Sequence, residues 1–266
     1  MSSGFADRQG WGERLGSDHP IRRILGTLLA LVLVAGIVLA GLHWAAPDPT
    51  QPSPVPPSPV LLPSPTPSPT GSLPQLVLTG DRSDDPIDFV FLIDFSGSFK
   101  DYDQMRRDAL QQVLKWAPAN LRDDDTFTVI SFATGSVVTM STTTVADIAA
   151  GSYSLSQTAP LGSGTNIIPG LALAEQTLAS STRQTSIVVL TDTAIADPDV
   201  SQIGGILTAM NVTSVSVILP TGMQVEQYWA KTFPTEAEFW AHSTNTQEIA
   251  VAVGEALAHG TGQHLQ

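Results

Sequence analysis

The residues best suited to chemistry follow a short apolar run at positions 89–93. The run ends at Asp94, and Ser96 and Ser98 follow at alternate positions. Alternate positions can direct one carboxylate and two hydroxyls toward a single point, and Gly97 permits a tight turn between them. Such hard oxygen ligands suit Mg²⁺ or Mn²⁺ better than zinc. A structural alternative is that the same side chains cap the following helix.

Two later segments carry side chains of the same kind. Residues 161–166 form a glycine-punctuated loop that contains Thr165 and leads into an apolar stretch. A second short apolar run, residues 187–190, is followed by a polar stretch that contains Asp192. Ligands of open α/β sheets bind at the carboxyl ends of the strands. The three segments are therefore candidates for one shared site.

The elements around these segments alternate between strands and helices. Residues 89–93 are apolar on both faces and too few for a helix, which is typical of a central parallel strand. Further strands are predicted at 126–132, 137–140 (a short edge strand), 187–190, 215–219 and 239–240, and helices at 102–116, 167–178, 199–210 and 247–257. This alternation predicts an α/β fold with a doubly wound, mostly parallel central sheet flanked by helices.

The polar motifs resemble, in order and spacing, those of the von Willebrand factor type A (vWA) family. They are Asp94-x-Ser96-x-Ser98, Gly164-Thr165 and Thr191-Asp192. The resemblance covers about residues 85–258 and implies a Rossmann-like domain with the family's metal-ion-dependent adhesion site. Phe99 and Thr193 depart from residues frequent in the family, and neither departure removes a ligand.

The resemblance also implies how five side chains share one ion. Ser96, Ser98 and Thr165 would bind Mg²⁺ or Mn²⁺ through their hydroxyls. Asp94 and Asp192 would hold the ion directly or through water. An Asp or Glu carboxylate from a protein partner would complete the octahedron, and the terminal helix would move when the loops rearrange.

Composition excludes several classes of function. The formal net charge is −13, and most acidic residues follow residue 46, which argues against binding nucleic acid through its phosphates. The lack of cysteine excludes disulfides, thiol catalysis and cysteine-ligated metals. Neither Ser96 nor Ser163 lies in a Gly-x-Ser-x-Gly motif, and the five histidines form no ligand-spaced cluster. We therefore expect a binding protein and no enzyme.

The chain before the predicted domain has three parts. Residues 1–23 are polar and predict a disordered cytoplasmic tail. Residues 24–42 carry no charge and are long enough to span a membrane. Arg22 and Arg23 precede this segment, which places the N-terminus in the cytoplasm and the rest outside. We favour an uncleaved signal anchor over a cleaved signal peptide because the apolar run exceeds the usual length.

Residues 43–75 are rich in Pro, Ser and Thr and predict an extended extracytoplasmic linker. Residues 76–260 are predicted to form one vWA domain, followed by a loose tail at 261–266. The three aspartates at 123–125 are expected to form a solvated loop. The predicted protein is a single-pass membrane protein that binds a partner through a metal ion. An envelope-assembly or regulatory scaffold remains the alternative, a metal-dependent hydrolase is the least favoured, and the sequence does not indicate an oligomeric state.

Overall fold

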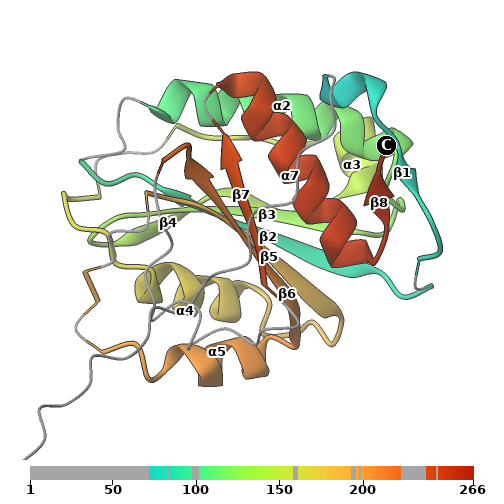
Figure 1. Ribbon diagram of the computed structural model, residues 1–266. Helices are drawn as coiled ribbons and strands as arrows, with labels where there is room; N and C mark the ends of the chain where they lie inside the picture. Colours follow the sequence, from blue (N-terminus) through green and yellow to red (C-terminus); the bar gives the residue numbers. More distant parts are fainter. Residues whose placement is uncertain are drawn as a thin grey trace, which may run out of the picture. The chain divides into compact units, whose positions relative to one another are not determined.

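The computed structural model describes residues 72–82, 84–97, 102–157, 161–192, 196–197, 199–222, 238–243 and 245–266 (Figure 1). The predicted cytoplasmic tail, the predicted membrane span at 24–42 and the linker up to residue 71 lie outside the described residues, as does Ser98. Within the described ranges, no helix has both the length and the apolar character that a membrane span requires.

A six-stranded sheet forms the centre of the domain, with strand order β4-β3-β2-β5-β6-β7. Its strands are β2 (Ile87–Asp94), β3 (Thr126–Phe132), β4 (Ser136–Thr144), β5 (Gln184–Leu190), β6 (Val212–Pro220) and β7 (Glu238–Ser243). All neighbouring strands are parallel except β3 and β4, which are antiparallel. The predicted mostly parallel sheet is confirmed, and the predicted edge strand at 137–140 is confirmed in place but longer.

Strand β2 is central because its side chains are apolar on both faces. It pairs with β3 on one side and β5 on the other, and all of its residues are buried. Phe89 and Phe91 belong to the core cluster on one face of the sheet, and Phe91 stacks on Phe127 with ring centroids 5.3 Å apart. Val90 and Leu92 belong to the cluster on the other face.

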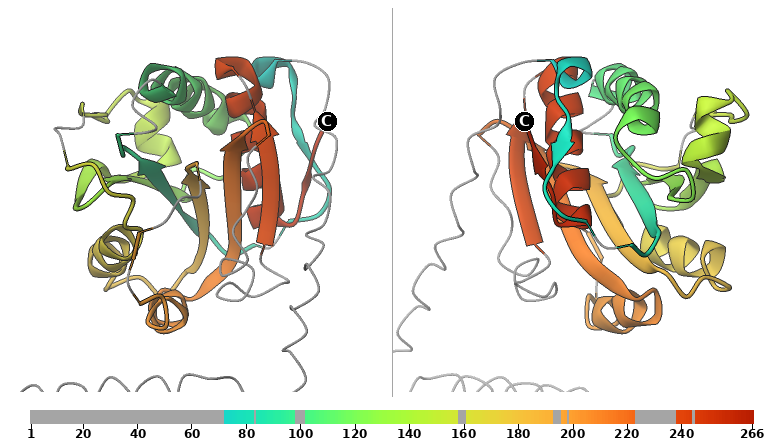
Figure 2. Two further views of the ribbon diagram at one scale, coloured as in Figure 1. Left: turned by 60° about the vertical axis from the view of Figure 1, so that its left-hand side comes forward. Right: turned by 90° about the vertical axis from the view of Figure 1, so that its right-hand side faces the viewer.

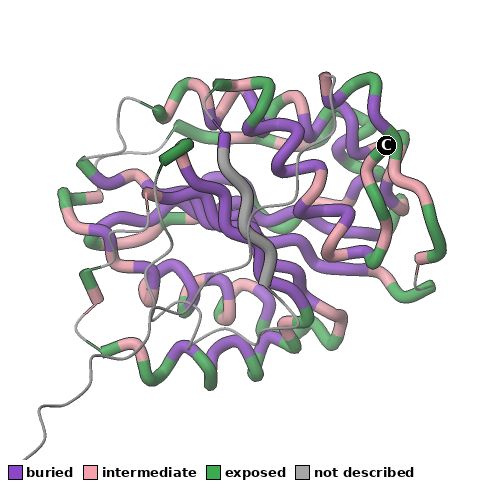
Figure 3. The backbone as a smooth tube through the Cα atoms, in the orientation of Figure 1, coloured by how far each residue is buried: buried purple, intermediate pink, exposed green. Residues whose placement is uncertain are grey.

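Helices cover both faces of this sheet (Figures 1 and 2). Helices α2 (Asp103–Trp116), α3 (Val145–Ala149) and α7 (Thr246–Thr261) supply one core cluster, and α4 (Ile168–Thr177) and α5 (Ile203–Ala209) supply the other. Figure 3 shows that the buried residues are concentrated in the sheet and that exposed residues lie on the outer sides of α4 and α5. The predicted flanking helices are confirmed.

One predicted helix is too long. Residues 199–210 were expected to be helical, and α5 begins only at Ile203. The Asp199 carboxylate accepts a hydrogen bond from the N–H of Ser201 at 2.9 Å, and this bond lowers the pKa of Asp199. A local side-chain bond of this kind competes with helical backbone bonding.

Both ends of the domain extend beyond the predicted boundaries. A short 3-10 helix, η1 (Leu73–Gln75), places Leu73 in the core. A Cβ added at Gly254 of α7 would lie only 2.6 Å from Leu73 Cδ1. Strand β8 (His264–Leu265) pairs with β1 (Leu78–Thr79). The predicted linker therefore includes residues of the domain core, and the prediction of a loose C-terminal tail is wrong for β8.

The triple-aspartate loop before β3 is only partly solvated. Asp123 and Asp124 are exposed as predicted, but Asp125 is completely buried. Its carboxylate accepts a hydrogen bond from the N–H of Ile87 at 2.9 Å and pairs with Arg82 at 2.5 Å. The prediction of a solvated loop is wrong for Asp125, because partners distant in the sequence enclose it.

Candidate metal centre

The candidate site lies where the parallel strands β2 and β5 end. Asp94 is the last residue of β2, and Thr191 and Asp192 directly follow β5. The Thr191 hydroxyl donates a hydrogen bond to Asp94 Oδ2 at 2.8 Å. This bond joins the first polar motif to the third across 97 residues of sequence.

The loop that carries Thr165 contacts both of its neighbours. A Cβ added at Gly97 would lie 3.9 Å from the Cβ of Ser163, so the first two loops are adjacent. The N–H of Ala196, after β5, donates to the carbonyl oxygen of Thr165 at 2.7 Å. The second loop therefore lies against the other two.

The Asp94 carboxylate is completely buried, and the described residues that donate hydrogen bonds to it are neutral. The N–H of Ser96 donates to Oδ1 at 2.8 Å, and the Thr191 hydroxyl donates to Oδ2. Burial raises the pKa of Asp94, the bonds from Ser96 and Thr191 oppose this shift, and the negative charge of Asp192 adds to it. A buried carboxylate in such surroundings gains from a nearby cation.

A buried arginine lies beside this carboxylate. Arg106 of α2 donates to the backbone carbonyl oxygen of Asp94 and, at 3.3 Å, to that of Tyr102. Burial lowers the pKa of the Arg106 guanidinium to about 10, while the charges of Asp94, Asp103 and Asp192 act in the opposite direction. The guanidinium therefore stays protonated at neutral pH.

The second loop is fixed by a carboxylate from the third. Asp197 accepts hydrogen bonds from the N–H groups of Ile167 at 2.7 Å and Ile168 at 3.4 Å, at the start of α4. These N–H groups have no partner within their own helix. Burial raises the pKa of Asp197, and the two backbone bonds act against that shift. Thr165, itself buried, lies two residues before Ile167, the first of the residues that are held in this way.

Glycine is required in the second loop. Gly162 has a φ of +97°, and a Cβ there would lie 2.5 Å from the Thr134 hydroxyl oxygen. The same oxygen accepts a hydrogen bond from the N–H of Gly164 at 3.0 Å. A side chain at Gly162 would be strained and would displace the Thr134 support.

Four of the five predicted ligands lie at this edge of the sheet. They are Asp94, Ser96, Thr165 and Asp192, and the fifth, Ser98, lies outside the described residues. Two carboxylates with hydroxyl oxygens suit a hard divalent cation. Within the described part of the chain, no group of three or more His, Cys, Asp or Glu side chains could hold a metal ion. An ion at this site would therefore depend on hydroxyl ligands.

Sequence reasoning missed several supporting side chains. The burial of Arg106 could have been predicted, because its spacing places it on the same helix face as the apolar residues Ala109 and Val113. Thr134 and Asp197 left none, because their partners lie about 30 residues away in sequence.

Comparison with known proteins agrees with this fold. Residues 89–194 match the family model of the von Willebrand factor type A domain. The fold of this segment is vWA-like. No curated protein matches the chain.

Two structures of proximal thread matrix protein 1 from the mussel byssus are similar to the chain. One has a TM-score of 0.53 at 16% identity. The other, whose metal-ion-dependent adhesion site (MIDAS) motif is occupied by zinc, has a TM-score of 0.51 at 18% identity. Each alignment covers 68% of this chain and 50% of the mussel protein. The chain thus spans about half the length of these structures, and at such identities the likeness concerns the fold alone.

Proposed function

We propose that this protein is a membrane-anchored binding protein whose vWA domain faces away from the cytoplasm. The domain holds Mg²⁺ or Mn²⁺ and binds, through the ion, an Asp or Glu carboxylate of a protein partner. The ligands are Asp94, Ser96, Ser98, Thr165 and Asp192. The uncharged apolar segment at 24–42 supports the anchor, and the Pro-rich segment that follows supports a spacer.

The observation that carries the proposal is the buried carboxylate of Asp94. Its two oxygens accept hydrogen bonds from the Ser96 N–H and the Thr191 hydroxyl, which orient the carboxylate without neutralising it. A second carboxylate, Asp192, is close enough to act on it electrostatically. Like charges brought together in a buried site favour the binding of a cation.

The chemistry of the other ligands favours partner binding over catalysis. A divalent ion here would supply a Lewis-acidic centre for an external carboxylate. Ser96 and Thr165 are neutral ligands, so they leave much of the ion's charge for the partner. Both are buried, which limits competition from water. We therefore propose a binding role and no turnover.

Metal binding can be tested on the full chain by thermal unfolding. The protein would be unfolded in EDTA and in Mg²⁺, Mn²⁺, Ca²⁺ or Zn²⁺. An ion at about 100 times its dissociation constant should add roughly 2.7 kcal/mol, a rise of a few degrees in Tm. We expect this rise with Mg²⁺ and Mn²⁺.

Two matched variants make the test specific. Asp192→Asn should abolish the rise, while Asp123→Asn, the same change at an exposed site, should retain it. If no divalent ion stabilises the wild-type chain at millimolar concentration, the metal role is wrong. If the rise persists in Asp192→Asn, the ion binds elsewhere.

A further inference from the structure

One of the largest completely buried side chains of the domain is charged. Arg106 has 1% of its surface exposed, on the inner face of α2 where its neighbours Ala109 and Val113 are apolar. Burying a guanidinium is unfavourable unless opposite charges and hydrogen-bond acceptors compensate. The groups around Arg106 should therefore reveal its role.

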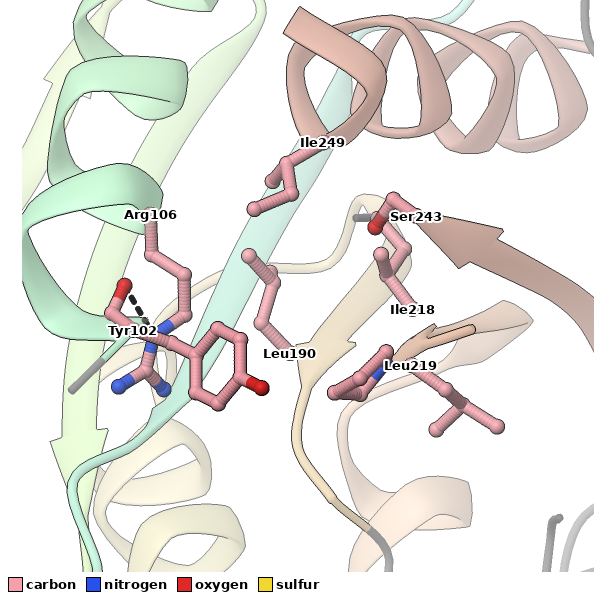
Figure 4. A pocket seen from close by; sticks show the side chains of 8 residues that line it. Tyr102, Arg106, Leu190, Ile218, Leu219, Ser243 and Ile249 are labelled. Atoms are coloured by element: carbon pink, nitrogen blue, oxygen red, sulfur yellow. Dashed lines mark hydrogen bonds between the residues drawn. The ribbon is translucent and has the colours of Figure 1, made fainter. Parts of the chain in front are cut away.

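The acceptors and charges around Arg106 include groups of the candidate metal centre and groups at the start of its own helix. Its guanidinium binds the carbonyl oxygens of Asp94 and Tyr102. In Figure 4 the side chain extends from α2 beside Tyr102, along a small pocket that Leu190, at the end of β5, also lines. The carboxylates that act on it are those of Asp94, Asp192 and, in the first turn of α2, Asp103.

We propose that Arg106 is a built-in counter-ion of the metal centre. Its fixed charge stabilises the Asp94 and Asp192 carboxylates when no divalent ion is present, and it opposes the ion when one binds. The second half of this inference rests on the proposed metal-binding function, and the first half does not.

The two effects have one electrostatic origin. Without the ion, Arg106 is a buried positive charge beside two carboxylates, so its removal takes away a charge that compensates them. With the ion bound, a cation and a guanidinium share the same low-dielectric surroundings and repel each other. Arg106 therefore stabilises the site when no ion is bound, and it lowers the affinity of the site for a divalent ion.

The test compares neighbouring arginines in the full chain. Arg106→Met removes the charge and keeps an unbranched side chain, and Arg106→Lys keeps the charge. Arg107→Met is the control, because Arg107 is more exposed and, among the described residues, donates only to the Ser156 carbonyl at 3.4 Å. Mg²⁺ affinity would be measured by calorimetry, and stability in EDTA by urea unfolding.

We expect Arg106→Met to bind Mg²⁺ roughly tenfold more tightly than the wild type and to be less stable in EDTA. Arg106→Lys and Arg107→Met should retain an affinity close to that of the wild type. Unchanged or weaker Mg²⁺ binding by Arg106→Met would overturn the proposal, since a residue that only positions Asp94 would give that result. If this variant does not fold, Arg106→Gln, which is neutral but can still donate, has the same expectation.

A double-mutant cycle in EDTA separates this inference from the metal-binding proposal. It combines Arg106→Met with Asp192→Asn and requires no ion. A counter-ion role predicts that the two changes together destabilise the protein less than the sum of their separate effects. Additive effects would overturn the counter-ion role even if Mg²⁺ binds. A wild type that binds no ion, together with non-additive effects, would refute only the metal function.

Discussion

The two ends of strand β2 each meet a completely buried aspartate, and the two carboxylates have different surroundings. At the start of β2, Asp125 pairs with Arg82 at 2.5 Å and accepts the N–H of Ile87. At the end of β2, the Asp94 carboxylate accepts bonds from a hydroxyl and an amide. Arg106 donates to the backbone carbonyl oxygen of the same residue.

This difference separates a structural carboxylate from one suited to binding. The cation that neutralises Asp125 is part of the chain and is in direct contact, so nothing further needs to bind there. The guanidinium of Arg106 donates to the backbone carbonyl oxygen of Asp94, and a second carboxylate, that of Asp192, lies near the Asp94 side chain. Its oxygens are thus oriented but still gain from an external cation.

The largest effect is expected at the start of β2. Asp125→Ala removes the partner of Arg82, whose side chain is 11% exposed, and leaves two backbone N–H groups without their acceptor. Breaking a buried ion pair in this way should lower the free energy of unfolding by about 3–5 kcal/mol. Urea unfolding would measure the loss, and Mg²⁺ affinity at the other end of the strand should stay unchanged.

The adjacent Asp124 provides the control for this experiment. It forms an ion pair with Arg122, and both side chains are well exposed. Exposed ion pairs contribute little to stability. Equal losses for Asp124→Ala and Asp125→Ala would contradict the assignment of a structural role to Asp125.

At the end of β2, the corresponding change should affect binding more than stability. Asp94→Asn keeps the size of the side chain and removes a charge that burial disfavours. The loss of this charge relieves its desolvation and its repulsion by Asp192, and it weakens the compensation of Arg106. Because these effects oppose each other, we expect the free energy of unfolding in EDTA to lie within about 1 kcal/mol of the wild type. Stabilisation by Mg²⁺ should be lost. A loss of several kcal/mol in EDTA would show that Asp94 is as structural as Asp125.

The sequence predicted one end of this strand better than the other. Asp94, Thr165 and Asp192 were predicted because each follows a strand or precedes a helix, and the strands converge at one edge. Asp125 was not predicted, because nothing in the triple-aspartate loop distinguishes it from its neighbours. Its burial depends on Arg82 and Ile87, about 40 residues earlier.

The supports of the site were unpredictable for the same reason. Asp197 contacts the start of α4 only because the fold places the loop after β5 against it. The predicted helix at 199–210 was too long, because apolar periodicity does not predict a local hydrogen bond such as that from the Ser201 N–H to the Asp199 carboxylate. Apolar patterns determine which segments pack in the core. The contacts between loops follow from topology.

A smaller effect is expected when a neutral donor to Asp94 is removed. Thr191→Val deletes the hydroxyl that binds Asp94 Oδ2 and should lower stability by about 1.5–3 kcal/mol. It should also weaken Mg²⁺ binding several-fold, because Asp94 Oδ2 is no longer held. Thr185→Val, which removes a buried hydroxyl that donates to the Met210 carbonyl at 2.7 Å, should lower stability but leave Mg²⁺ affinity unchanged. Weaker Mg²⁺ binding by both variants would mean that general destabilisation explains the effect.

The second loop allows a comparison between two glycines. Gly162→Ala should cost about 1–2 kcal/mol for its positive φ, plus the clash with Thr134, and should weaken Mg²⁺ binding. Gly151→Ala, at a φ of +71° with nothing within 4 Å, should show the strain alone and bind Mg²⁺ normally. Equal Mg²⁺ affinities in the two variants would contradict a role for Thr134 in supporting the site.

The smallest expected effect is the pH dependence of the empty site. Because burial raises the pKa of Asp94 above its ordinary value of 3.8, the folded protein binds more protons than the unfolded chain just above that pH. The stability of the wild type relative to Asp94→Asn, measured in EDTA, should therefore fall as the pH rises through this window.

Asp199 should give a pH dependence of the opposite sign, since the hydrogen bond from the Ser201 N–H lowers the pKa of Asp199. Stability relative to Asp199→Asn should fall as the pH decreases from 3.8. Urea unfolding between pH 3 and pH 7 would measure both differences, and the same sign for both would contradict the view that burial dominates at Asp94.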